Sequence, residues 1–61
     1  MTAPQPDRSS RLVLAEEMIL EAARLCEVVG VTDPEQTRNA GVLFRLAQRV
    51  AVDSGRLDRA A

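Results

Sequence analysis

The side chains that could carry chemistry in this 61-residue chain are one cysteine, nine carboxylates and eight arginines. The chain has no histidine, so a Ser-His-Asp triad or a histidine-based metal site would lack an essential member. Glu16 and Glu17 are adjacent, but neighbouring residues on a helix diverge and cannot face each other across a substrate. No glycine-rich phosphate loop and no GxSxG motif is present. We therefore expect no enzyme activity, no metal ion and no cofactor.

The single cysteine, Cys26, lies among apolar residues, which is typical of a small buried hydrophobe rather than a reactive thiol. Residues 1–7 have neither the basic start nor the apolar centre of a secretory signal. The longest apolar run is four residues, whereas a membrane-spanning helix needs about 20. We expect a cytoplasmic protein that does not enter a membrane.

The chain is short for an independent domain, although its 46% apolar and 28% charged residues are typical of a globular protein. A domain of this length buries only about 60% of its unfolded surface, and one cysteine permits no disulfide within the chain. The sequence therefore predicts one domain that shares its core with a second copy. We expect residues 1–8 to form a flexible arm and residues 53–61 a short frayed tail.

The net charge of −1 is unevenly distributed along the chain. Residues 1–14 carry +1, residues 15–30 carry −3, residues 31–52 carry +1 and residues 53–61 carry 0. A folded molecule could therefore present sides of opposite sign. Three arginines share one helix face because they are spaced seven and four residues apart, and we interpret them as a solvated stripe or as dimer partners for the glutamates of residues 15–30. They are Arg38, Arg45 and Arg49.

Apolar residues recur at helical spacing from Ala15 to Val29 and predict a first helix there. The recurring residues are Met18, Ala22, Leu25 and Val29, with Ile19 and Cys26 beside them. Glu16 and Glu17 would suit the positive end of the helix dipole. Gly30 would suit the position just past the last turn.

A second helix is predicted to begin after Asp33, because Pro34 disfavours helical geometry in the residue before it. Asp33 would then be the N-cap, Pro34 the first helical residue, and Gln36 the residue that bonds back in a capping box. Thr32 and Glu35 offer the same motif one residue earlier, but the proline argues against that register. The helix would end at 54–55, before the tail.

The second predicted helix has apolar residues on most of its sides, which again indicates a partner chain. The residues are Ala40, Val42, Leu43, Phe44, Leu46, Ala47, Val50 and Ala51. Gly41 costs about 1 kcal/mol relative to alanine inside a helix. Together with Ala40 it would form a smooth patch where another helix could cross closely.

Residues 9–14 fit two structures. As a strand they would point Ser10, Leu12 and Leu14 to one side, and as a helix they would extend the first helix back to about Ser10. The compact Leu-Val-Leu run favours the strand, as does the absence of a Glu or Gln at position 13 to complete a capping box. Ala15 argues against it, because alanine is a poor N-cap.

The order of these elements resembles the ribbon-helix-helix DNA-binding proteins, the family of the Arc and methionine repressors and many antitoxins. The resemblance covers residues 9–52 without insertions and favours the strand. The residues that carry it are Leu12, Val13, Leu14, Ala15, Glu16, Glu17, Met18, Gly30, Thr32, Glu35, Arg38 and Ala40. It implies a mainly α fold with one short N-terminal strand and two helices, in an intertwined homodimer.

The resemblance also implies a site in which the paired strands of two copies enter the major groove of double-stranded DNA. The residues expected to contact bases are Ser9, Arg11 and Val13, with Arg11 either reading a guanine or simply solvated. Those expected to contact phosphate are Arg8, Thr32, Asp33 and Glu35. The expected dimer core is Leu12, Leu14, Met18, Ala22, Leu25, Val29, Ala40, Leu43, Phe44, Ala47 and Val50.

Two functions follow as hypotheses. The first is a small dimeric transcription regulator, a repressor that could also be an antitoxin with a toxin as its protein partner. The alternative is a dimeric helical hairpin that acts as an adaptor or docking module and binds no nucleic acid. Pairing of residues 9–14 between two copies would support the first, and a continuous helix from Ser10 to Val29 would exclude its ribbon.

Overall fold

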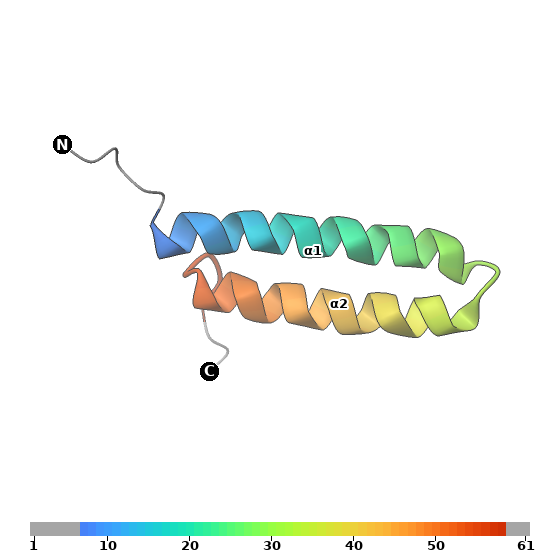
Figure 1. The fold of residues 1–61 in the computed structure, drawn as a ribbon. Helices are drawn as coiled ribbons and strands as arrows, with labels where there is room; N and C mark the ends of the chain where they lie inside the picture. The colour runs from blue at the N-terminus through green and yellow to red at the C-terminus, as the bar shows by residue number, and fades with distance from the viewer. Residues whose placement is uncertain (1–6, 59–61) are drawn as a thin grey trace.

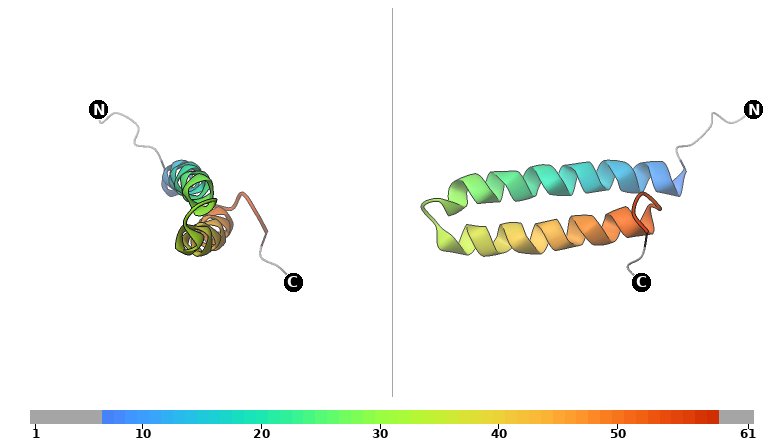
Figure 2. Two further views of the ribbon diagram at one scale, coloured as in Figure 1. Left: turned by 90° about the vertical axis from the view of Figure 1, so that its right-hand side faces the viewer. Right: turned by 180° about the vertical axis from the view of Figure 1, so that it is seen from behind.

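Two antiparallel helices joined by a tight turn make up the fold in the computed structural model, which describes residues 7–58 (Figure 1). Helix α1 comprises Arg8–Gly30 and helix α2 comprises Pro34–Asp53. The described residues contain these two helices and no strand. Seen end-on, the hairpin is a single layer of two helices, and its two ends lie together opposite the turn (Figure 2).

The predicted strand over residues 9–14 is wrong, because these residues are the first turns of α1. The helix begins earlier than expected since Asp7 is its N-cap. The Asp7 carboxylate accepts a hydrogen bond from the backbone N–H of Ser10 at 2.8 Å, and the Arg11 N–H donates to the Asp7 carbonyl at 3.2 Å. Asp7 supplies the side-chain acceptor that a helix starting near Ser10 had lacked.

The ribbon-helix-helix fold is therefore not the fold of residues 7–58. Ser9, Arg11 and Val13 do not alternate with their neighbours across a ribbon but follow one another around a helix. Leu12 and Leu14 would share one side of a strand, whereas in α1 Leu12 is half-buried and Leu14 is exposed. Arg8 is the first residue of α1 rather than part of an arm, and residues 1–6 lie outside the described residues.

Gly30 is the last residue of α1, not the residue after it, and its backbone is not left-handed. Its lack of a side chain matters for a different reason. A Cβ at Gly30 would clash with Thr37 Oγ1 and lie 2.9 Å from the Thr37 backbone nitrogen. The Thr37 hydroxyl donates to the Gly30 carbonyl at 3.3 Å, so glycine allows the first turn of α2 to close against the end of α1.

The predicted start of α2 is confirmed. Asp33 is the N-cap, its carboxylate accepts from the Glu35 N–H at 3.2 Å, and Pro34 opens the helix. The reciprocal bond predicted for Gln36 is not formed: the Gln36 amide oxygen accepts from the Asn39 amide nitrogen at 3.1 Å. The Asp33 N–H instead donates to the Val29 carbonyl at 3.0 Å.

The predicted stop at residues 54–55 is confirmed, but the residues after it are ordered against the helix. The Gly55 N–H donates to the Val52 carbonyl at 3.0 Å and the Arg56 N–H to the Ala51 carbonyl at 3.1 Å, which is the Schellman pattern. Gly55 has a φ of 85°, a left-handed value that glycine adopts without strain. Up to Arg56 and Leu57 the predicted frayed tail is thus a folded helix cap, and residues 59–61 lie outside the described residues.

Alanines form the seam between the two helices. Four of them, Ala23 on α1 and Ala40, Ala47 and Ala51 on α2, are at most 2% exposed. Small side chains at these positions let the helices approach closely, but each contributes little apolar area. Among the described residues no large side chain is fully buried, so the hairpin lacks the large buried side chains of an ordinary domain core.

Candidate functional site

Large apolar side chains lie on the outside of the hairpin. Met18 is 66% exposed, Leu25 is 61% exposed and Leu46 is 46% exposed. The other exposed large hydrophobic residues are Leu14, Val28, Val29, Val31, Val42 and Leu57. Single exposed hydrophobic residues are normal on a protein surface, whereas a contiguous group indicates a binding surface.

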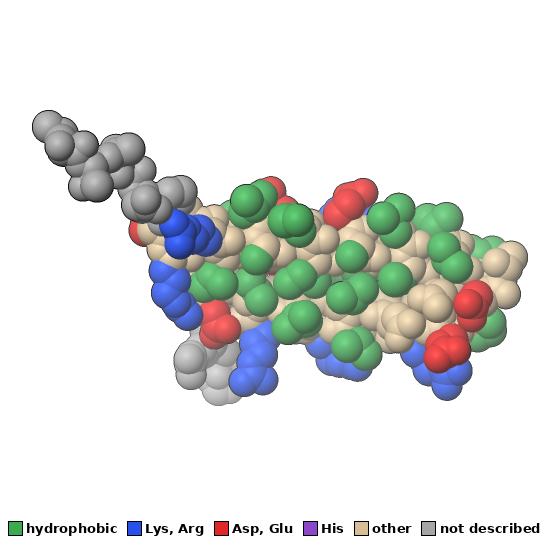
Figure 3. All heavy atoms as spheres, viewed as in Figure 1, with side chains coloured by type: hydrophobic (Ala, Val, Ile, Leu, Met, Phe, Trp, Pro, Cys, Tyr) green, Lys and Arg blue, Asp and Glu red, His purple; other side chains and the backbone are tan. Residues whose placement is uncertain are grey.

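Hydrophobic side chains gather on one side of the molecule, where they cover α1, α2 and the seam between them (Figure 3). Helical spacing identifies the residues concerned, since those three or four apart share a side of a helix. We call this surface the apolar face, and it comprises Met18, Ile19, Ala22 and Val29 on α1 with Leu43, Leu46 and Val50 on α2. All seven are exposed or half-buried.

The residues predicted for the dimer core divide into two groups. Ala40 and Ala47 are buried within the single hairpin. The other nine are exposed or half-buried: Leu12, Leu14, Met18, Ala22, Leu25, Val29, Leu43, Phe44 and Val50. One copy of the chain therefore packs its alanines and leaves its larger apolar side chains available for another surface.

The shape of the hairpin shows the same shortage of burial. The Cα trace spans only 10 Å in its thinnest direction, about one helix diameter. Among the described residues, each helix is therefore covered by the other helix alone.

At the open end of the hairpin, a buried carboxylate joins the C-terminal cap to α1. Glu16 is only 5% exposed, and its two carboxylate oxygens accept from Arg56 Nε at 2.7 Å and from Arg56 Nη2 at 2.5 Å. Bidentate pairs of this kind fix geometry as well as charge. Ser54 helps to hold the arginine in place, because its buried hydroxyl donates to the Ala51 carbonyl at 2.9 Å and accepts from the Arg56 N–H at 3.3 Å.

The ion pair perturbs both partners. Hydrogen bonding from Arg56 lowers the pKa of Glu16 against the opposing effect of burial, and the same bonds raise the pKa of Arg56. Glu16 is thus a charged group that closes the open end of the hairpin, not a group in the first turn of a helix as predicted. Glu17, in contrast, is exposed, so the predicted divergence of these two side chains is confirmed.

Sequence reasoning missed the Glu16–Arg56 pair because the partners are 40 residues apart and the tail was expected to fray. A usable signal was present. Once α1 is extended to Arg8, Glu16 lies four residues from Leu12 and seven from Ala23, on the side that faces α2. A carboxylate in such a position requires a cation or several hydrogen-bond donors.

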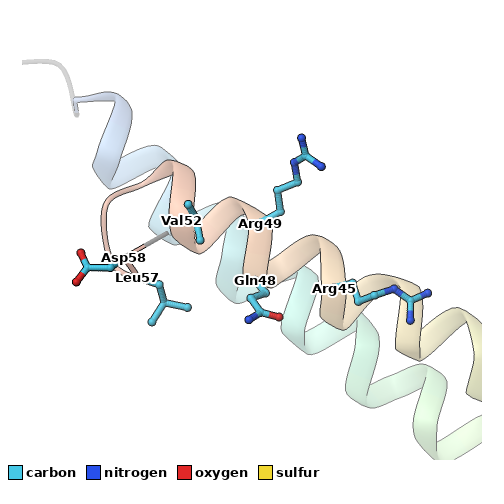
Figure 4. Close-up of a pocket in the computed structure, with 6 residues that line it drawn as sticks. All are labelled: Arg45, Gln48, Arg49, Val52, Leu57 and Asp58. Atoms are coloured by element: carbon cyan, nitrogen blue, oxygen red, sulfur yellow. The ribbon is translucent and has the colours of Figure 1, made fainter. Parts of the chain in front are cut away.

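The three arginines of the predicted stripe, Arg38, Arg45 and Arg49, are all exposed. Within residues 7–58 no salt bridge is found for them. Two of them border a shallow groove of about 500 Å³, whose other lining residues are Gln48, Val52, Leu57 and Asp58 (Figure 4). The Arg45 and Arg49 side chains extend outward and away from each other rather than converging on a common point (Figure 4).

The residues predicted to contact DNA are not brought together. Ser9, Arg11 and Val13 lie at the start of α1 together with Arg8, which donates from Nη1 to the Asp53 carbonyl at 3.1 Å. The rest of the predicted phosphate site lies at the turn, at the opposite end of the hairpin (Figure 1). It consists of Thr32, Asp33 and Glu35. The two groups are separated by the length of α1, about 35 Å for 23 residues.

Other sites are sparse in the part of the chain that the structure describes. Cys26 is a free thiol and only partly buried. Among residues 7–58 there is no group of three or more carboxylate, histidine or cysteine side chains that could hold a metal ion. Neither α1 nor α2 combines the length and apolar character needed to cross a membrane.

Comparison with protein-family models, with curated proteins and with solved structures gives no match to this chain.

Proposed function

We propose that the protein is a helical-hairpin docking module that acts as a homodimer, with the apolar faces of two copies packed together as the core of a four-helix bundle. The observation that carries this proposal is the uncovered apolar face. Its seven residues are exposed or half-buried in one copy, while the residues buried between α1 and α2 are alanines. Helices in bundles place their larger apolar residues toward a common core.

Packing two copies face to face would supply what one copy lacks. The side chains of Met18, Val29 and Leu46 would leave water, and apolar burial is the main favourable term in folding and association. The Glu16–Arg56 pair would keep the open end of each hairpin closed, so both helices present their apolar residues as one rigid surface. In this proposal the task of the protein is association, and no chemical step is required of it.

The DNA-reading hypothesis required a ribbon made from residues 9–14 of two copies. These residues are helical, and Arg45 and Arg49 of α2 extend outward without converging on a common point (Figure 4). The docking hypothesis uses the surface that the structure leaves uncovered, which is why we prefer it.

A dimerisation reporter in cells tests the proposed function. The chain is fused to a reporter domain that is active only when two copies are brought together. We expect the native chain to activate it, and Met18→Gln combined with Leu46→Gln to abolish activation. The matched control is Val28→Gln, because Val28 is 71% exposed but lies four residues from Arg24 and outside the apolar face. No activation by the native chain, or equal loss with the control, would contradict the proposal.

A further inference from the structure

The charges along the outer edges of the hairpin differ in sign between the two helices. Acidic side chains appear along the α1 edge and arginines along the α2 edge (Figure 3). From residue 17 to 27, α1 carries three glutamates and one arginine, a net charge of −2. From residue 38 to 49, α2 carries three arginines and no carboxylate, a net charge of +3.

These two stretches lie at the same height in the hairpin. Gly30 contacts Thr37 beside the turn, and Glu16 is bonded to Arg56 at the open end. The antiparallel helices therefore place residues 17–27 of α1 alongside the middle of α2, where the arginines lie. The charges are exposed, and the single ion pair found on this part of α1, Arg24 with Glu21 at 3.5 Å, is solvent-accessible.

Two symmetric arrangements can bring two such faces together with the helices aligned. If the two-fold axis runs parallel to the helices, α1 of one copy lies over α2 of the other. If the axis runs across the helices, α1 lies over α1 and α2 over α2. In the first arrangement, the α1 stretch of net charge −2 in each copy lies beside the α2 stretch of net charge +3 in the other. In the second, the two negative stretches lie beside each other and so do the two positive stretches, and like charges in proximity oppose association.

Resting on the proposed function, we infer that the partner on the apolar face is a second copy turned about an axis parallel to the helices, so that each α1 packs on the α2 of its partner. This arrangement puts both interhelical turns, residues 31–33, at the same end of the bundle. It also places the two arginine edges on opposite sides of the dimer. The alternative would collect six arginines on one side, a basic surface suited to a nucleic acid or an acidic protein.

The distance between the two turns distinguishes the arrangements. Cys26→Ser removes the native thiol, and Thr32→Cys in that background gives one spin-label position at the exposed turn. With both turns at one end, the labels are separated by the width of the bundle, and we expect a distance below about 25 Å. With the turns at opposite ends, the 20–23-residue helices separate the labels by more than about 30 Å, which would overturn the inference.

A monomer would give no dipolar coupling between labels, and that result would refute the proposed function together with the inference. A dimer with a long label distance would refute the packing alone. The two failures are therefore distinguishable in one experiment.

Charge reversal provides a second test that does not depend on labels. Arg49→Glu should weaken the dimer about two- to fivefold at low ionic strength, as expected for the loss of exposed charge pairs. Glu21→Arg in the same chain should restore most of the affinity. If α2 packed on α2, Arg49→Glu alone would relieve repulsion and strengthen the dimer, so a strengthened dimer would overturn the inference.

Discussion

Replacement of Met18 by glutamine tests whether the apolar face closes a dimer. Met18 is 66% exposed in the hairpin, and glutamine has a similar length and helix propensity. Full burial of a methionine contributes about 1.5–3 kcal/mol, so covering the exposed two-thirds contributes about 1–2 kcal/mol per copy. A symmetric dimer contains the residue twice. The substitution should therefore cost about 2–4 kcal/mol and raise the dimer Kd about 30-fold to several hundred-fold.

Sedimentation velocity over a dilution series measures this Kd, and circular dichroism of each variant checks that the helices are retained. Val28→Gln is the matched control, because Val28 is at least as exposed on the same helix but belongs to the side that carries Arg24. We expect the control to change the Kd less than threefold, in keeping with a surface substitution of about 0.5 kcal/mol or less. Equal effects of the two substitutions would show that exposure alone, and not the apolar face, governs association.

Three further predictions concern the hairpin itself, each measured by urea unfolding at fixed protein concentration. Glu16→Gln should lower the unfolding midpoint, because it removes the buried charge paired with Arg56. Since that pairing lowers the pKa of Glu16, the difference in stability from the native chain should be full at neutral pH, shrink below about pH 4.3 and vanish once the folded-state carboxyl is protonated. A difference in stability that grew on acidification would contradict this. Gly41→Ala should stabilise the hairpin by about 0.5–1 kcal/mol, because the added Cβ meets only the Arg45 side chain at 3.9 Å. Gly30→Ala should destabilise the hairpin, because its Cβ would collide with Thr37. Stability changes of the same sign for the two substitutions would refute the distinction. Asp33→Ala should cost about 1 kcal/mol through loss of the α2 N-cap, and an unchanged midpoint would show that Pro34 alone fixes the helix start.

The elements that depend on local chemistry were predictable from the sequence. Asp33 and Pro34 determine the start of α2 through one capping bond and one fixed φ, and Gly55 determines its end through a left-handed residue. The apolar spacing from Met18 to Val29 also predicted a helix there correctly. Each of these features involves residues within a few positions of one another.

The start of α1 was mispredicted because the signal lay just outside the segment that seemed decisive. The apolar pattern of residues 9–14 fits either a strand or a helix. The helix is selected by Asp7, whose carboxylate accepts the hydrogen bond from the Ser10 N–H. The family resemblance did not correct the error, since it rests on common residue types in a common order. For Gly41, the structure shows no close approach of α1, because an added Cβ would meet only the Arg45 side chain at 3.9 Å, while Ala40 beside it is buried; the crossing of a partner helix at this position stays a prediction.

The Glu16–Arg56 pair could not be derived from local patterns, because it depends on how the two helices align and on the cap that returns Arg56 to α1. The larger apolar residues were predicted as a dimer core, but the sequence could not show that alanines would be the only buried apolar side chains of the described hairpin. That division follows from the close approach of the helices. It leaves the larger apolar residues for a second copy.

The mass of the native chain in solution tests the central claim most directly. Sedimentation equilibrium at micromolar concentration should give twice the chain mass of 6.7 kDa, because the apolar face is covered only when two copies associate. A species of 6.7 kDa that retains full helicity at these concentrations would contradict the account.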